Sequence, residues 1–364
     1  MYDLIVIGGG PAGSSAAITA ARAGARVLLL EKGHLPRHKV CGEFVSAEVL
    51  DLLGSLLDSA ASDLLQAAPR IPRSRLFLDG RVLETVVNPP AASLARLDLD
   101  AALWNAAVRA GVDTRQQTSA QRLAGQGPFQ VTSSAGEFEA RAILNASGRW
   151  SNLRAAPPAN GAGREKWLGL KAHFGEATTD ASVDLYFFSG GYCGVQPVQL
   201  ASRPDGGRVN VCAMVRADVA TNLAEVFAQQ PQLHQRSHSW QALSEPVSTS
   251  PLVFQEPQPE AGGILQAGDT AGFVDPFVGD GISLALRSGA LAAQSLRPFF
   301  RGETSLSHAV RQYREAYRQD LLPVFRASSK LRKLLLLPKP LRVPLLLLLE
   351  KSPSFTRYMV NRTR

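Results

Sequence analysis

Cysteine is scarce in this chain of 364 residues, which contains only Cys41, Cys193 and Cys212. An odd, widely spaced set cannot form the paired framework of a small disulfide-stabilised domain, and it suits a reducing compartment. The histidines show no spacing typical of a metal site, and no sequence pattern indicates a Ser–His–Asp triad. We therefore expect no bound metal and no triad-type nucleophile.

The chain also lacks long apolar runs. No stretch reaches the roughly 18 apolar residues that a membrane-spanning helix requires. Residues 1–10, MYDLIVIGGG, have no basic n-region and end in a glycine turn instead of a signal-peptide cleavage site. These features predict a cytoplasmic protein.

Most of the chain carries no net positive charge, although the formal net charge of the whole chain is +8. The segment from Arg297 to the end holds 15 Lys/Arg and 4 Asp/Glu, so the remainder is slightly negative. This basic tail is rich in leucine and carries no nucleic-acid-binding signature, so we expect no nucleic-acid partner. Within it, residues 332–351 contain two short leucine runs among basic residues and prolines. They fit either peripheral contact with an anionic membrane or packing against the protein.

The pattern that is present predicts an α/β fold. Residues 3–7, 11–24 and 26–30 read as strand, helix and strand, which together make a βαβ unit. Between 165 and 215, β-branched and aromatic segments separated by turn residues predict an antiparallel sheet. Further elements are expected as helices at 98–110, 280–297 and 305–335, and as strands at 142–146 and 263–268.

A glycine motif follows the first strand and opens the first helix. Gly8 allows a tight turn, Gly10 lets the backbone approach a pyrophosphate, and Gly13 permits close packing of helix on strand. Pro11 and Ala12 begin the helix, whose N-terminus favours the phosphate charge. In this βαβ context the motif predicts a dinucleotide site.

An acidic residue ends the second strand. Glu31 lies 18 residues beyond Gly13, where its carboxylate can accept hydrogen bonds from ribose hydroxyls. Lys32 follows it, and no arginine replaces Glu31, which argues against a 2′-phosphate.

A second motif lies at 268–282, GDTAGFVDPFVGDGI, and separates FAD from NAD. Asp269 follows a strand, where it can bind a ribityl chain, and the loop then enters a helix near Ile282. Its backbone N–H groups and the helix dipole would stabilise the negative charge of a reduced flavin. The alternative is an ordinary glycine-rich turn. The candidate flavin-binding residues here are Gly268, Asp269, Pro276, Gly279, Gly281 and Ile282.

These two motifs and the segment PRHKVCGEFVS at 36–46 resemble the p-hydroxybenzoate-hydroxylase-fold flavoproteins. Within that fold, the Cys-Gly-Glu segment is similar to the geranylgeranyl reductase family of FAD-dependent oxidoreductases. The similarity extends over most of residues 1–300. It implies that Arg37, Cys41 and Gly42 lie near the flavin ring or the pyrophosphate, and that Arg96 sits by the FAD.

Two departures from the pattern narrow the function. Ser147 stands where hydroxylases of this fold carry the Asp of an Asp-Gly pair, which weakens an aromatic-hydroxylase interpretation. Residues 191–197, GYCGVQP, lack the Trp found on the substrate sheet of geranylgeranyl reductases and flavin halogenases. The missing Trp argues against a halogenase and leaves the substrate open.

Cys41 is the candidate catalytic residue. A thiol beside a flavin could tune it or donate a proton, although Cys41 also fits as a small packing residue next to Gly42. It has no CxxxxC partner, so disulfide-reductase chemistry is excluded. Cys193 and Cys212 fall in predicted strands and are expected in the core.

The resulting architecture is a Rossmann-type, discontinuous FAD-binding domain with an antiparallel β-sheet substrate domain and C-terminal helices. We expect the FAD domain at 1–75, 95–155 and 260–300, the substrate domain at 76–94 and 156–259, and a helical segment at 301–364. The Pro/Ala/Gly-rich stretch 155–163 would cross between domains. Because there is a single dinucleotide fingerprint, NAD(P)H would bind transiently at the flavin.

Three functions remain open. The first is reduction of an isoprenoid or similar lipidic alkene by reduced FAD. The second is NAD(P)H- and FAD-dependent hydroxylation of a greasy aromatic or polyketide-type substrate. The third is a membrane-associated flavin-binding protein without turnover. The sequence does not indicate an oligomeric state.

Overall fold

The computed structural model describes residues 1–59, 62–149, 153, 166–201, 206–250, 252, 256–274 and 279–335. Several predictions concern residues outside these ranges, namely the crossing at 155–163, Pro276, and residues 336–351 of the leucine-rich segment. In the part of the chain that is described, no helix is both long and apolar enough to cross a bilayer.

The first sheet is built around the N-terminal βαβ unit. Its strands run in the order β16-β17-β9-β1-β2-β6, and β1, β2, β6, β9 and β17 are parallel. β1 and β2 are buried along most of their length, as expected of parallel strands covered on both faces. The strands are β1 (Tyr2–Ile7), β2 (Val27–Leu30), β6 (Asp113–Arg115), β7 (Ala120–Gly125), β8 (Phe129–Ser133), β9 (Gly136–Asn145), β16 (Glu260–Ala261) and β17 (Ile264–Gln266).

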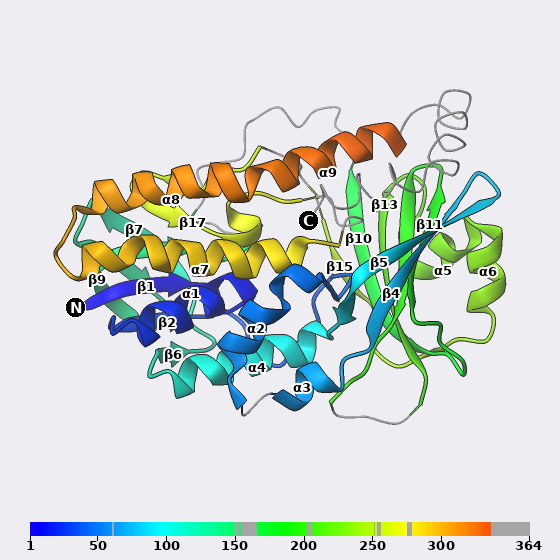
Figure 1. The fold of residues 1–364 in the computed structure, drawn as a ribbon, viewed down its shortest axis with the longest axis horizontal. Coiled ribbons are helices and arrows are strands. Elements are labelled where there is room, and N and C mark those ends of the chain that lie inside the picture. Colours follow the sequence, from blue (N-terminus) through cyan, green and yellow to red (C-terminus); the bar gives the residue numbers. More distant parts are fainter. Residues whose placement is uncertain are drawn as a thin grey trace.

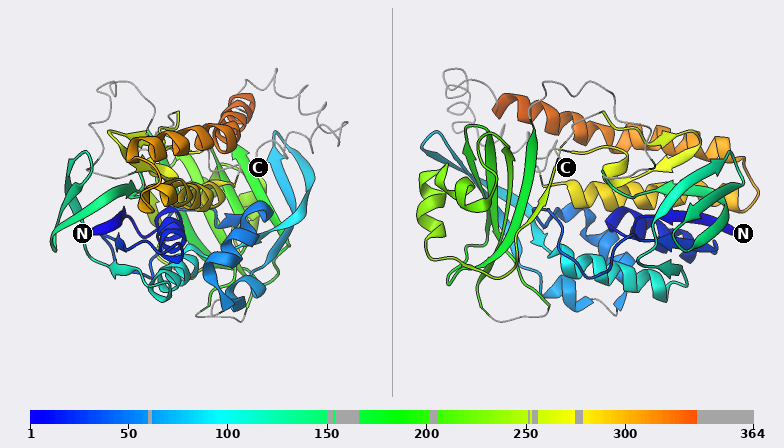
Figure 2. Two further views of the ribbon diagram at one scale, coloured as in Figure 1. Left: turned by 60° about the vertical axis from the view of Figure 1, so that its left-hand side comes forward. Right: turned by 180° about the vertical axis from the view of Figure 1, so that it is seen from behind.

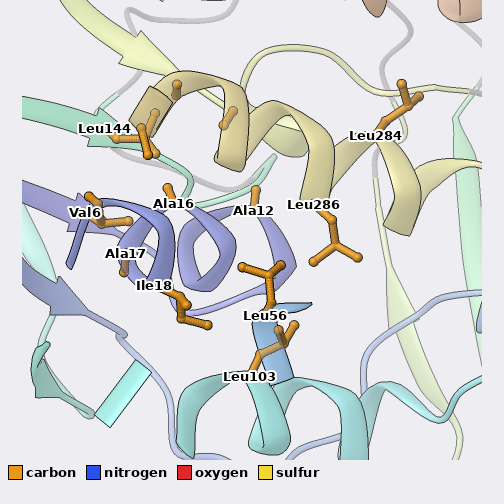
Figure 3. Packing of buried hydrophobic residues seen from close by; sticks show 14 of the residues in the cluster. Val6, Ala12, Ala16, Ala17, Ile18, Leu56, Leu103, Leu144, Leu284 and Leu286 are labelled. Carbon is orange, nitrogen blue, oxygen red and sulfur yellow. The ribbon is translucent and has the colours of Figure 1, made fainter. Parts of the chain in front are cut away.

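Helices from both ends of the sequence pack together over this sheet. α1 (Pro11–Arg22) lies against α7 (Gly281–Phe300) (Figures 1 and 3). On the side of α1 that faces away from α7, it packs against α2 (Leu50–Leu57) and α4 (Arg96–Arg109). A Cβ on Gly289 would lie 2.0 Å from the carbonyl oxygen of Ala12. The first turn of α1 is therefore in direct backbone contact with the middle of α7.

The second sheet contains the predicted antiparallel strands. Its order is β14-β10-β13-β12-β11-β4-β5-β3, with β15 also paired to β10, and β11 runs parallel to β4. Its strands are β3 (Phe44–Val45), β4 (Arg70–Leu78), β5 (Arg81–Ser93), β10 (Trp167–Gly175), β11 (Ser182–Phe188), β12 (Gly191–Pro197), β13 (Arg208–Arg216), β14 (Gln241–Ala242) and β15 (Val247–Thr249). The short helices α5 (Leu223–Ala228) and α6 (Pro231–Ser237) cover its outer face, away from the first sheet (Figure 1).

The fold class is confirmed, since a parallel α/β domain and a largely antiparallel sheet lie side by side (Figure 2). β3 and the first residues of β4 join the second sheet although they precede residue 76. Sheet membership alone does not fix domain limits, and the predicted limits stay predictions.

The C-terminal helices α8 (Leu306–Asp320) and α9 (Leu322–Leu335) continue the layer of α7. The sequence predicts one helical stretch over 305–335, but the chain breaks at Leu321 because Pro323 has no N–H to extend the preceding helix. The buried hydroxyl of Tyr313 donates to the carbonyl oxygen of Gln266 at 2.7 Å, which ties α8 to β17. The remaining short turns are η1 (Ala47–Val49), α3 (Ser62–Gln66) and η3 (Gly268–Thr270).

Candidate functional site: a cavity between the two sheets

A cavity of about 830 Å³ lies between the carboxyl edge of the first sheet and the inner face of the second. It collects almost all the residues predicted to bind cofactor, although they come from distant parts of the chain. Gly13 is not on its wall, and Pro276 is outside the described residues. The predicted residues that line it are Gly8, Gly10, Pro11, Ala12, Glu31, Lys32, Arg37, Cys41, Gly42, Arg96, Gly268, Asp269, Gly279, Gly281 and Ile282.

The three motif glycines have different tasks. Gly8 has φ of +106°, and a Cβ there would lie 2.3 Å from the carbonyl oxygen of Ala146. A Cβ on Gly13 would lie 1.8 Å from the carbonyl oxygen of Gly8, so both glycines are required by the fold itself. A Cβ on Gly10 would have only Arg96 Nη2 nearby, at 3.8 Å, and would point into the cavity. Gly10 therefore keeps space free for a ligand at the N-terminus of α1.

Glu31 is held as a buried carboxylate at the end of β2. Its oxygens accept hydrogen bonds from the backbone N–H groups of Gly9 and Gly33, both at 2.8 Å, and from Arg37 Nη2 at 2.6 Å. Burial raises the pKa of this carboxyl, but the two backbone hydrogen bonds and the Arg37 charge outweigh burial and lower it overall. An ionised acceptor thus stands where the ribose role of Glu31 is predicted, and Lys32 next to it is exposed.

Cationic side chains gather on the cavity wall near the start of α1. Arg37, Lys39 and Arg96 all line the cavity, and Arg37 Nε is buried with no hydrogen-bond partner. Burial, together with the charges of Arg37 and Arg96, lowers the pKa of Lys39 to about 8. Asp100 balances one charge by binding Arg96 Nε and Nη2, each at 2.8 Å. The remaining positive charge suits an anion such as a pyrophosphate.

The second motif borders the cavity between the two sheets. Gly268 has φ of +60° and packs against Ala12, while Asp269 follows β17 with its side chain 39% exposed. Asp269 Oδ2 lies 3.4 Å from Arg149 Nε, and the Arg149 guanidinium sits 4.2 Å from the ring centroid of Phe273. Both side chains line the cavity, so Asp269 remains accessible to a hydroxylated ligand.

Replacing Asp269 by alanine is expected to weaken FAD binding by about 1.5–3 kcal/mol, or about 10- to 150-fold in Kd. The reason is the loss of a charged acceptor for the ribityl hydroxyls. Fluorescence titration of flavin-stripped protein measures the effect. Arg149→Gln serves as the matched control, because it removes the present partner of Asp269 and keeps the carboxylate. An unchanged Kd in Asp269→Ala would show that this side chain does not hold the ribityl chain.

The Cys-Gly-Glu segment is fastened to the second sheet. Asn210 Nδ2 donates to the carbonyl oxygens of Cys41 at 3.1 Å and Gly42 at 2.8 Å. The Cys41 sulfur accepts from the N–H of Glu43 at 3.3 Å and lines the cavity. Burial raises the pKa of the Cys41 thiol, so it is protonated at neutral pH and is no thiolate nucleophile.

Cys41→Ser is expected to leave FAD bound and to shift the flavin reduction potential, since a more polar hydroxyl would replace the thiol on the cavity wall. A spectroelectrochemical titration measures the shift. Cys193→Ser is the comparison, because Cys193 is fully buried in the core between the second sheet and its outer helices. Identical potentials and spectra for wild type and Cys41→Ser would leave Cys41 as a packing residue.

The inner face of the second sheet contributes Tyr192 and Met214 to an apolar wall of the cavity, and Leu252 and Phe273 pack beside them from outside the strands. Gly169 faces the same cavity without a side chain. Cys212 also lines the cavity, so its expected place in the core was wrong. Strand alternation directs Cys212 and Met214 to the inner face, and this face is lined by the cavity instead of being filled.

Sequence reasoning missed several residues at the site. Lys39, Arg149 and Phe273 line the cavity, and Lys171 lies just behind it, 2.8 Å from Glu43. Two of them carried a local signal, because Lys39 lies in the segment 36–46 and Phe273 in the motif at 268–282, both of which already pointed to the flavin. Arg149 and Lys171 lie outside these segments.

These residues fit FAD. The open Gly10 position and the helix N-terminus suit a pyrophosphate, Glu31 a ribose, and Asp269 a ribityl chain. Bound there, FAD would supply two-electron hydride chemistry, with the protein providing placement and exclusion of water. Among the residues described, no group of His, Cys, Asp and Glu side chains is placed to hold a metal ion.

Comparison with known proteins finds similarity to FAD-dependent oxidoreductases. A family model described as FAD dependent oxidoreductase matches residues 3–59. Digeranylgeranylglycerophospholipid reductase 2 of Methanopyrus kandleri is 26% identical over 358 residues, which cover 92% of this chain and 86% of that protein.

Solved structures show the same fold. The flavin-dependent brominase Bmp2 superposes with a TM-score of 0.76 at 19% identity, covering 100% of this chain and 93% of the brominase. A geranylgeranyl bacteriochlorophyll reductase-like protein of Thermoplasma acidophilum gives 0.72 at 21% identity, covering 94% and 89% of the two chains. The chain is therefore an FAD-dependent oxidoreductase, and the resemblance of its motifs to the geranylgeranyl reductase family is confirmed.

Proposed function

We propose that this enzyme reduces a carbon–carbon double bond in an isoprenoid or similar lipidic substrate, with reduced FAD as the hydride donor. The observation that carries this proposal is the apolar wall, which faces the FAD-binding edge across one continuous cavity. An apolar chain lying on Tyr192, Met214 and Leu252 would remove hydrocarbon from water at about 25 cal/mol per Å². The relatives named as digeranylgeranylglycerophospholipid reductases support the same substrate class.

We propose NAD(P)H as the transient electron source. A single dinucleotide fingerprint is present, and its Gly8 and Gly10 line the cavity in which we place FAD. The nicotinamide would then reach the flavin through the same cavity, before the lipid substrate enters.

Anaerobic single turnover tests the reductase proposal. Protein reduced with one equivalent of dithionite is mixed, without oxygen, with a lipid bearing geranylgeranyl chains. The flavin absorbance should return and a product with fewer double bonds should appear. The fully saturated lipid is the control and should leave the flavin reduced. Reoxidation that requires oxygen and yields a hydroxylated product would instead support the monooxygenase alternative.

We also propose peripheral contact of residues 332–351 with anionic membranes, through leucine side chains and flanking Lys and Arg. A lipidic substrate would make such contact useful, because it could enter the cavity from the bilayer. Flotation with anionic and neutral vesicles tests this, and protein that ignores both would assign the leucine runs to packing.

A further inference from the structure

A buried charged cluster joins the cavity wall to the second sheet. Lys171 Nζ lies 2.8 Å from Glu43 Oε1 and 3.5 Å from His38 Nδ1. His173 Nε2 lies 2.7 Å from Glu43 Oε2, and the rings of His38 and His173 meet edge to face with centroids 5.3 Å apart. Lys171, Glu43 and His173 are at most 1% exposed, whereas His38 is half-buried and lines the cavity. The cluster therefore leads from the buried interior to the cavity through one imidazole.

The fold holds this cluster rigidly. Lys171 and His173 alternate on β10 and point to the same inner face. Glu43 also accepts from the N–H of Arg96 at 2.8 Å, so it is fixed between β10 and the start of α4. Burying these charges costs several kcal/mol each before pairing, so the cluster is an expensive feature for packing alone.

The Lys171 ammonium group determines which ring nitrogen of His38 carries the proton. An ammonium group has no acceptor, so His38 Nδ1 must accept from Lys171 and Nε2 carries the imidazole proton. Burial lowers the pKa of His38, and the Lys171 and His173 charges lower it further, against the opposing carboxylates of Glu43 and Asp98. At neutral pH His38 is therefore a neutral N–H donor backed by a cationic proton source.

Alkene reduction needs such a group. When hydride adds to one carbon of a double bond, the other carbon must receive a proton for the π bond to be replaced by two C–H bonds. The flavin loses two electrons with the hydride. The proton must come from a protein group on the wall, since an apolar substrate excludes water from this part of the cavity.

We propose that His38 delivers this proton from Nε2, and that Lys171, fixed by Glu43 and His173, returns a proton to Nδ1. Lys171 ends neutral and is recharged from solvent through His38 after the product leaves. This inference rests on the proposed function and assigns its proton donor.

The kinetic test compares four holoproteins: wild type, His38→Gln, His34→Gln and Tyr192→Phe. His34 is the matched control, because it lies on the same segment, is exposed, and is not on the cavity wall. His38→Gln should bind FAD and be reduced normally, yet its anaerobic reduction of alkene should be about 10²- to 10⁴-fold slower. His34→Gln should match wild type. Tyr192→Phe tests the Tyr192 hydroxyl as the alternative proton donor on the cavity wall. The proposal would be overturned if His38→Gln reduced the alkene at the wild-type rate, or if Tyr192→Phe alone showed the loss of rate.

A second readout does not depend on turnover. The pKa of His38, followed by NMR in the holoprotein, should rise in Lys171→Met, where a neighbouring cation is lost. It should fall further in Asp98→Asn, where an anion on α4 is lost and the buried cluster is left intact. A His38 pKa that ignores both changes would overturn the coupling.

Failure of the proposed function would look different from failure of this inference. In the first case the wild-type protein itself reduces no alkene, and the proton transfer is withdrawn with it, whatever the NMR titration gives. In the second case wild type turns over and His38→Gln turns over equally well.

Discussion

Gly10→Val is expected to give a folded but colourless protein. Gly10 has φ of −79° and ψ of −175°, values that any residue adopts, so valine introduces no backbone strain. Its side chain would enter the cavity where the pyrophosphate approaches the N-terminus of α1. Losing two charge-assisted hydrogen bonds at about 1.5–3 kcal/mol each would weaken FAD binding by about 100-fold or more.

Flavin content and thermal unfolding, measured together, decide this prediction. Gly54→Ala is the control, because a Cβ there meets only Leu65 at an ordinary 3.7 Å and Gly54 lies away from the cavity. It should keep both stability and FAD. Gly8 and Gly13 are unsuitable, since a Cβ at either would clash with backbone and unfold the turn. Stoichiometric FAD in Gly10→Val would refute the placement of the pyrophosphate.

Glu43→Gln is expected to destabilise the protein by about 3–5 kcal/mol, the usual cost of breaking a buried ion pair. The carboxylate is fully buried and accepts from Lys171, His173 and the N–H of Arg96. Glutamine would leave the Lys171 charge uncompensated in the interior. Glu84→Gln is the control, because Glu84 pairs with Arg73 at 3.6 Å on an exposed surface and should cost at most about 1 kcal/mol.

The effect has a defined pH dependence. Burial raises the pKa of Glu43, but its hydrogen bonds and the Lys171 and His173 charges lower it overall to about 2. In the unfolded chain a glutamate titrates near about 4.3. The ionised group therefore stabilises the native state above about pH 4.3, and this stabilisation is lost as pH falls toward about 2. Urea unfolding of wild type and Glu43→Gln should differ most near neutral pH and converge in acid. A constant difference would place the effect in packing.

The N-terminal unit was predictable because its signals are local. Strands 3–7 and 26–30 are apolar on both faces, and the glycines between them have one structural explanation in that context. The strand that precedes the second motif and the helix that follows it, near Ile282, were predictable for the same reason. Here residue type, spacing and burial all favour the same structure.

Other features depend on contacts that sequence spacing does not reveal. β7, with the sequence AQRLAG, is largely exposed and has no apolar alternation, so the hairpin it forms with β8 gave no signal. Glu43 and Lys171 are 128 positions apart, and only the docking of the second sheet brings them together. Cys212 was predicted in the core because the alternation of side chains along a strand shows which residues share a face. It does not show whether that face packs against other side chains or borders a cavity.

A structure of the FAD complex would show directly whether one cavity holds the flavin against the second sheet. It should show the pyrophosphate at Gly10 and the N-terminus of α1, a ribose at Glu31 and the ribityl chain at Asp269. The flavin ring should lie between Cys41 and the apolar wall of Tyr192 and Met214. FAD bound elsewhere, or a flavin ring separated from that wall by protein, would contradict this placement of the cofactor.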